Sequence, residues 1–249
     1  MMNYMRSETY KLLKTKGIYI TYAICIMLLI LAALTLYYFG HNGKYFPYYR
    51  ADFYYNNVFG MWLLIIMIGV IINLLLTNKE SKQIMKQSIA FGIEKQTIYF
   101  GKYIVSLLFF VFICLISTVV MVVAAHLLMP ENKTATSEFL KSLINFAPIL
   151  LAGFTFGHTL NMSSLKEYMS GFIFVFVLLN LSTVAYLLKS INSVFTVLYE
   201  YSPKVLADRV LAEYMDETVK LSPDFWISGV IITVISLLIG YIYFKKRDF

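Results

Sequence analysis

Few residues in this sequence combine reactive chemistry with an apolar setting. His126 and His158 fall inside long apolar runs, as do Cys25 and Cys114. An ionisable side chain in such a run is by default a candidate functional group. For the histidines we favour the alternative, a neutral ring hydrogen-bonded to a neighbouring helix, because it avoids burying a charge. The two cysteines are expected to be free, small apolar residues.

Motifs that would make the chain an enzyme are missing. The sequence contains no G-x-x-x-x-G-K-[ST] phosphate-binding loop, no H-E-x-x-H, no G-x-S-x-G and no cysteine pair at metal-ligand spacing. An intramembrane hydrolase would need acids facing histidines, and the apolar runs contain no acid. We therefore expect a non-catalytic chain without a metal or cofactor of its own.

The elements that carry these residues belong in a membrane. Of 249 residues, 59% are hydrophobic and 14% are charged, and the mean hydropathy is +0.71, which excludes a soluble domain. Six runs without Asp, Glu, Lys or Arg are long enough to span a bilayer as helices: 18–39, 58–76, 103–129, 143–162, 170–188 and 225–244. The first is expected to be a retained helix rather than a cleaved signal. We predict an all-α integral membrane protein with six transmembrane helices in a single domain, 1–249.

Basic residues are distributed unequally between the segments that join these runs. The N-terminus, the loop 77–102, the turn 163–169 and the C-terminus together hold 13 of the 21 Lys and Arg residues but 5 of the 14 Asp and Glu residues. Basic residues accumulate in the cytoplasmic segments of multi-pass proteins. We therefore predict that both termini are cytoplasmic. The net charge of +7 is then a topology signal and does not indicate a nucleic-acid partner.

Two of the predicted cytoplasmic segments have amphipathic patterns. In 2–16, basic residues surround an apolar stripe, which predicts a helix on the inner leaflet or simply a positively charged flank. The stripe consists of Met2, Met5, Thr9, Leu12 and Leu13. In the loop 77–102, Ser81 is expected to cap a short helix that Gly92 ends. This helix carries Ile84, Met85, Ser88, Ile89 and Phe91. We interpret it as a docking helix for a soluble subunit, with an interfacial helix anchored by lysines as the alternative.

On the predicted outer side, the first loop is rich in aromatic residues and the segment 189–224 is the longest. The aromatic residues are Tyr45, Phe46, Tyr48, Tyr49, Phe53, Tyr54 and Tyr55. We expect them to form an interfacial belt, with a substrate-contacting surface as the alternative. Within 189–224, Ser202 and Pro203 begin a predicted amphipathic helix that covers the ends of the spans or caps the exit of a translocation path.

Small and polar residues within the runs predict how the helices pack. Gly153-x-x-x-Gly157 and Ser236-x-x-x-Gly240 favour close approach of two helices. The polar residues are Asn73, Ser117, Thr118, Thr155, Asn161, Asn180, Ser182 and Thr183. Each is expected to make an interhelical hydrogen bond, and the alternative is that they line an amphipathic path.

Three stretches beside the runs combine basic, aromatic and small residues. They are Glu8-x-Tyr10-Lys11-Leu12-Leu13-Lys14-x-Lys16, Lys86-Gln87-Ser88-Ile89-Ala90-Phe91-Gly92-Ile93 with Tyr99-x-Gly101-Lys102, and Phe244-Lys245-Lys246-Arg247-Asp248. In these stretches, and in its layout over the whole length, the sequence resembles ABC-2-type permease subunits of Gram-positive bacteria. The relatives that it resembles most are lantibiotic-immunity permeases and the exporter of phenol-soluble modulins, which are small amphipathic peptide toxins.

The resemblance implies an ABC-2-type exporter fold in a bacterial plasma membrane. Two permeases, alike or different, would pair with two ABC ATP-binding subunits, which would hold ATP and Mg²⁺. The helix 81–92 would be the coupling helix, and the N-terminal helix would lie beside it. ATP would close the paired ATPases, move the coupling helices together and shift the bundle from inward to outward access. Spans one and five would face the second permease, placing Asn180 and Ser182 near the seam. Together with His158, these are the candidate residues of a substrate path or dimer seam.

The leading hypothesis is therefore a permease that exports amphipathic or antimicrobial peptides, or confers immunity to them. The absence of acids from the spans favours an apolar or amphipathic cargo, in contact with membrane lipid. The alternative is a membrane sensor or immunity protein that binds peptide without transporting it.

Overall fold

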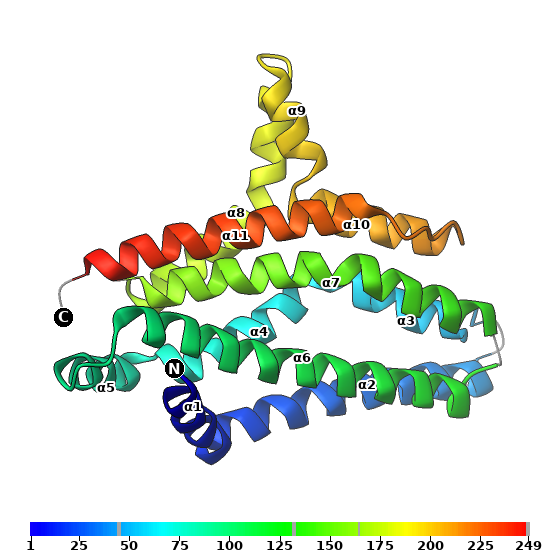
Figure 1. Ribbon diagram of the computed structural model, residues 1–249. Coiled ribbons are helices and arrows are strands. Elements are labelled where there is room, and N and C mark those ends of the chain that lie inside the picture. The colour runs from blue at the N-terminus through cyan, green and yellow to red at the C-terminus, as the bar shows by residue number, and fades with distance from the viewer. Residues whose placement is uncertain (44–45, 131–132, 164, 248–249) are drawn as a thin grey trace.

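The computed structural model describes residues 1–43, 46–130, 133–163 and 165–247, whose regular secondary structure is α-helical throughout. The predicted all-α fold is confirmed. Figure 1 shows most of the helices running side by side, with α8 and α9 projecting away from them. The helices are α1 (Met2–Lys14), α2 (Lys16–Asn42), α3 (Ala51–Gly60), α4 (Trp62–Thr77), α5 (Lys79–Ala90), α6 (Lys95–Leu128), α7 (Lys133–Met162), α8 (Glu167–Leu188), α9 (Ser193–Glu200), α10 (Pro203–Met215) and α11 (Pro223–Lys246).

Five of the described helices are long and apolar enough to cross a bilayer, namely α2, α6, α7, α8 and α11. The helices α3 and α4 meet at Met61 with a bend of 59°, and they make a sixth candidate span when the bent pair is counted as one. The second predicted span therefore corresponds to part of a bent pair of helices. The first helix of this pair, α3, lies mostly in the segment that the sequence suggested was a loop.

Several helices extend beyond the apolar runs that predict them. The helix α6 begins at Lys95 rather than at 103, and α7 begins at Lys133 rather than at 143. Hydropathy detects only the part of a helix that lies in hydrocarbon, whereas backbone hydrogen bonding continues where charged side chains reach water. Pro148 consequently lies in the interior of α7.

Both termini lie at the same end of the bundle, together with α5 (Figure 1). We call this the terminal end, and the opposite end, which carries α3 and α10, the far end. The chain enters the bundle through α1 and leaves it through the last turns of α11. All the segments predicted to be cytoplasmic therefore meet at the terminal end, while the side of the membrane that this end faces stays a prediction.

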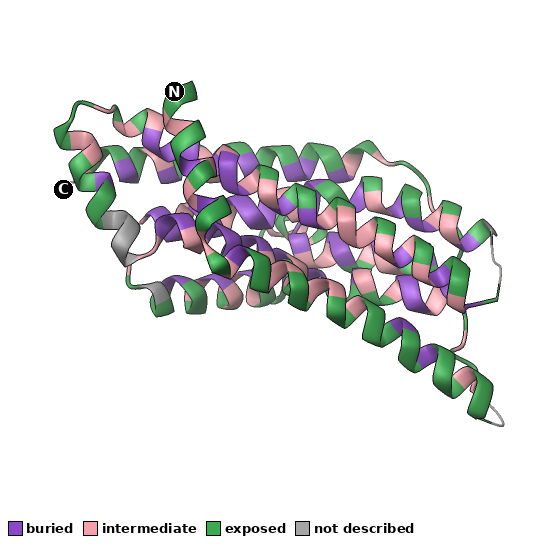
Figure 2. Cartoon of the chain, turned by 90° about the horizontal axis from the view of Figure 1, so that it is seen from below, coloured by how far each residue is buried: buried purple, intermediate pink, exposed green. Residues whose placement is uncertain are grey.

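Burial follows the inner faces of the helices. Figure 2 shows buried residues concentrated between the helices and exposed residues along their outer faces. The exposed residues of the spans include large apolar side chains such as Leu115, Leu127 and Phe172. An outward-facing apolar surface of this kind is typical of helices that contact lipid.

Aromatic side chains build the core of the far end. Tyr54 and Tyr55 of α3 are fully buried, so the expectation of an interfacial belt is wrong for these two residues. The Tyr55 ring stacks on Phe139 of α7 at 4.3 Å between centroids, and the Tyr54 hydroxyl donates to the carbonyl of Leu29 at 2.9 Å. The α3 helix turns these rings inward, which the loop interpretation did not anticipate. Tyr45 lies outside the described residues.

Glycines allow the closest helix contacts. A Cβ atom on Gly153 or Gly157 of α7 would meet Ile66 or Val70 of α4 at 2.5 and 2.3 Å, and one on Gly240 of α11 would meet the Tyr99 hydroxyl at 2.3 Å. The close packing predicted from the small-residue pairs is confirmed. A glycine that sequence spacing did not indicate, Gly229, lies against the backbone of another helix.

Gly229 of α11 lies directly against the backbone of Pro148, because a Cβ atom there would meet the Pro148 carbonyl oxygen at 2.6 Å. We expect Gly229→Ala to destabilise the protein by about 1–3 kcal/mol, as overpacking of a tight contact does. Thermal unfolding of the purified protein in detergent measures the change. Gly171→Ala is the matched control, because nothing lies within 4 Å of the corresponding Cβ position in α8. Equal unfolding temperatures for the two variants would contradict the assigned contact.

Candidate functional site

The short helix α5 ends in a well-formed glycine cap. Gly92 has a φ of +85°, its N–H donates to the carbonyl of Ile89 at 2.9 Å, and the Ile93 N–H donates to the carbonyl of Ser88 at 3.0 Å. These two bonds form a Schellman motif, which favours glycine at the left-handed position. The predicted role of Gly92 is confirmed. The helix begins at Lys79, directly after the extended residue Asn78, rather than after Ser81, whose side chain lies outside the described part of the structure.

The apolar residues of α5 divide between two faces. Met85 is buried, and Ile89 packs with it against Ile98, Tyr99 and Phe244 at the terminal end. Ile84 and Phe91 point outward instead, with 47% and 87% of their surface exposed. Ser88 donates its hydroxyl to the carbonyl of Ile84 at 2.9 Å and so serves the helix itself. The exposed part of the predicted docking face is therefore Ile84 and Phe91, while Met85 and Ile89 hold the helix in place.

The ends of three spans are tied together beside α5. Lys95, the first residue of α6, donates to the carbonyl oxygens of Lys245 and Arg247 at 2.9 and 2.6 Å. Arg247 in turn donates to the carbonyl of Ser163, which follows α7, at 3.3 Å. These bonds use carbonyls that helix ends leave without intrahelical partners. The terminal end therefore offers α5 a fixed support. Asp248, the next residue of the C-terminal stretch, lies outside the described residues.

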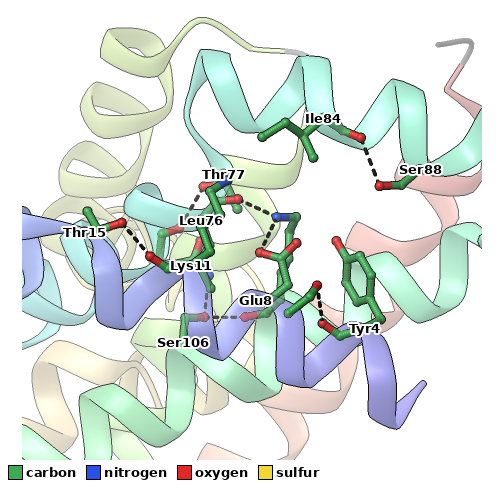
Figure 3. Close-up of polar contacts among 12 residues, drawn as sticks. Tyr4, Glu8, Lys11, Thr15, Leu76, Thr77, Ile84, Ser88 and Ser106 are labelled. Carbon is green, nitrogen blue, oxygen red and sulfur yellow. Dashed lines mark hydrogen bonds and ion pairs between the residues drawn. The ribbon is translucent and has the colours of Figure 1, made fainter.

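A buried ion pair joins α1 to the bundle. The Lys102 ammonium lies 2.9 Å from Glu8 Oε2 and donates to the carbonyl of Leu76 at 2.7 Å (Figure 3). The two charged side chains are 1% and 6% exposed. Burial, followed by the charge of Glu8, raises the pKa of Tyr4, so that its phenol stays neutral beside the carboxylate. The pair therefore links α1, α4 and α6 at one point.

The packed face of α1 differs from the predicted stripe. Met5 and Leu12 pack inward, as expected, but Met2 and Leu13 are exposed, and Glu8 takes a buried position between the inward pair. Tyr4 lies against Gly101, where a Cβ atom would meet its ring at 2.8 Å. The inward face of α1 is thus seated on α6. The spacing of Glu8 from Met5 and Leu12 was a signal in the sequence that could have revealed its burial.

A second polar cluster lies between the spans α4, α6 and α7. The Asn73 amide donates to Ser106 Oγ at 2.7 Å and lies 2.8 Å from His158 Nδ1, while Asn161 donates to Asn73 Oδ1 at 3.0 Å. All four side chains are buried. Because the amide nitrogen of Asn73 can only donate, His158 accepts at Nδ1 and is a neutral imidazole. For His158, this geometry supports the expected neutral ring that is hydrogen-bonded to a neighbouring helix. His126, in contrast, is exposed near the end of α6.

The candidate path residues do not converge. His158 is fully buried in the cluster just described, whereas Asn180 of α8 donates its amide to the carbonyl of Phe176 in its own helix at 2.9 Å. Ser182 of α8 is buried, whereas its neighbour Leu181 is exposed. Among the predicted polar residues, Asn73 and Asn161 make interhelical bonds, and Thr155 lies 2.9 Å from the Tyr103 hydroxyl of α6.

We expect Asn73→Leu to destabilise the protein by about 1–3 kcal/mol, because it leaves His158 and Asn161 without their shared partner. Asn180→Leu is the matched control, since it removes only a bond within α8. Thermal unfolding in the same detergent compares the two. If Asn180→Leu lowered the stability as much as Asn73→Leu, the hydrogen bonds of the Asn73 cluster would stabilise the protein no more than a bond within one helix does.

Comparison with known proteins agrees with this layout. A sequence model described as ABC-2 family transporter protein matches residues 4–201, which extend from α1 to α9. Neither the curated proteins nor the solved structures give a match. With five or six apolar helices of spanning length in its described part, the chain is a multi-pass membrane protein. It belongs to the ABC-2 family of transporter proteins, whose members form the membrane component of a transporter and generally act with an ABC ATP-binding subunit.

Proposed function

We propose that this chain is the permease of an ATP-driven exporter of amphipathic peptides, with α5 as the helix that binds a separate ATP-binding subunit. The observation that carries this proposal is the exposure of Ile84 in the short helix α5 and of Phe91 directly after it. Exposed apolar side chains on a rigidly supported element are typical of a surface that another protein covers. Met85 and Ile89 supply the support from the opposite face.

In this proposal, ATP hydrolysis by the partner subunit supplies the energy for transport. The sequence has no phosphate-binding loop of its own, so ATP and Mg²⁺ would bind the ATP-binding subunit. The terminal end would face the cytoplasm, where ATP is available. The concentration of basic residues in the segments that meet at this end supports that orientation.

An apolar or amphipathic cargo fits the character of the spans. The six apolar runs contain no Asp, Glu, Lys or Arg, and Asn73, Ser106, His158 and Asn161 of α4, α6 and α7 bond to one another. A cavity at the far end has a volume of about 150 Å³, too small for a peptide helix. We infer that cargo passes along the apolar surface between this chain and a second permease, with Asn180 and Ser182 of α8 near that seam. Peptides of the lantibiotic and modulin type have the required amphipathic character.

We expect Ile84→Asp combined with Phe91→Asp to abolish binding of the ATPase, because a desolvated apolar anchor contributes about 2 kcal/mol or more to an interface. Tagged permease is co-expressed with a candidate ABC ATP-binding subunit and purified. The ATPase activity that copurifies with the double variant should be at least about tenfold lower than with the wild type. Met215→Asp, which changes an exposed apolar residue at the far end, is the control and should retain full activity. Retention of ATPase by the double variant would refute the assigned docking face.

A transport assay distinguishes an exporter from a protein that only senses peptide. In inside-out vesicles that contain the complex, a fluorescent Leu/Lys amphipathic peptide of about 20 residues should accumulate only when ATP is hydrolysed. A complex that binds the peptide but accumulates none with ATP would favour the sensor or immunity function over export.

A further inference from the structure

We propose that Lys102 is a positioning residue for coupling, because its single ammonium joins α1, the junction between α4 and α5, and α6 into one rigid joint. The inference rests on the proposed role of α5 as the docking helix. Displacement of α5 by the ATPase is then passed through this joint to the spans, and α1 moves with them.

The junction between α4 and α5 is the first part of the argument. The helix α4 ends at Thr77, Asn78 is extended with ψ at 175°, and α5 begins at Lys79. Leu76 lies in the last turn of α4, where a helix leaves its carbonyl groups without intrahelical partners. The Lys102 ammonium donates to the Leu76 carbonyl oxygen at 2.7 Å. A cation at the carbonyl end of a helix also interacts favourably with the helix dipole. The docking helix is therefore separated by one residue from a helix end that Lys102 fixes.

Glu8 supplies the second part. Its carboxylate lies 2.9 Å from the same ammonium, and neither side chain has appreciable contact with solvent. In surroundings of low polarity this attraction is much stronger than at a protein surface. An uncompensated charge here would be costly, so Glu8 and Lys102 stay together as long as the fold is intact.

The packing around the ion pair makes the joint rigid. Leu12 of α1 and Leu76 of α4 belong to the same buried cluster, with Tyr103 of α6 one residue beyond Lys102. Tyr4 contacts the backbone at Gly101 without an intervening Cβ atom. The three helices consequently have little freedom to slide past one another at this point. If the Glu8–Lys102 ion pair only stabilised the fold, its removal would lower the stability of the protein. If it couples α5 to the spans, its removal lowers the amount of peptide moved per ATP hydrolysed.

The main variant is Glu8→Met with Lys102→Met, which removes both charges and leaves apolar side chains of similar length. Replacing a buried ion pair by apolar residues is often neutral for stability, so this variant should fold. Ile84 and Phe91 are untouched, and the ATPase should bind at the wild-type level. In proteoliposomes with the fluorescent Leu/Lys peptide, the amount of peptide moved per ATP hydrolysed should fall at least about tenfold.

A charge swap tests the bond to Leu76 separately. Glu8→Lys with Lys102→Glu restores the ion pair, but a carboxylate at position 102 cannot donate to the Leu76 carbonyl. In the swapped variant, the amount of peptide moved per ATP hydrolysed should therefore stay low, as in the double Met variant. Lys14→Met, an exposed lysine of α1, is the control and should leave peptide moved per ATP unchanged.

Two results would overturn the role of Lys102: wild-type peptide movement per ATP in the double Met variant, or recovery of coupling in the charge swap. If the double Met variant binds the ATPase and moves the wild-type amount of peptide per ATP, but unfolds at a much lower temperature, the ion pair only stabilises the fold. If the wild-type chain itself bound no ATPase, the proposed function of α5 would fail, and this inference with it.

Discussion

A polar group that enters the apolar bundle needs a partner within the protein, because lipid offers none. This constraint determines where the helices of this chain can lie. The Lys102 ammonium can be buried only where Glu8 and the Leu76 carbonyl surround it, so α1 must be seated on α6 beside the end of α4. Asn73 likewise requires Ser106, His158 and Asn161 at hydrogen-bonding distance, which sets the register of α4, α6 and α7.

Glycines make these polar contacts geometrically possible. Side-chain hydrogen bonds between helices need backbones that approach closely, and Gly153 and Gly157 let α7 lie against Ile66 and Val70 of α4. The same helix that carries these glycines carries His158 and Asn161. Close packing and polar bonding therefore support one another along a single interface, which is the common design of helix pairs in membranes.

Properties that depend on local composition were predictable from the sequence, and properties that depend on distant partners were not. The apolar runs predicted the spans, and Gly92 predicted a helix end, because both signals act within a few residues. Glu8 and Lys102 are 94 positions apart, so no pattern of neighbouring residues predicts their pairing. The division of α5 into Met85 inside and Phe91 outside likewise depends on Tyr99 and Phe244, which lie elsewhere in the chain. Tyr55 was misinterpreted because its stacking partner, Phe139, belongs to another helix.

The Asn73 cluster also has a consequence for the order in which the bundle can be completed. Synthesis proceeds from the N-terminus, and Ser106 follows Asn73 by 33 positions, whereas His158 and Asn161 follow it by 85 and 88. The amide of Asn73 therefore gains its first interhelical bond when α6 is inserted and its remaining bonds only with α7. The hydrogen bonds of this cluster can therefore be complete only once α7 has joined α4 and α6 in the membrane.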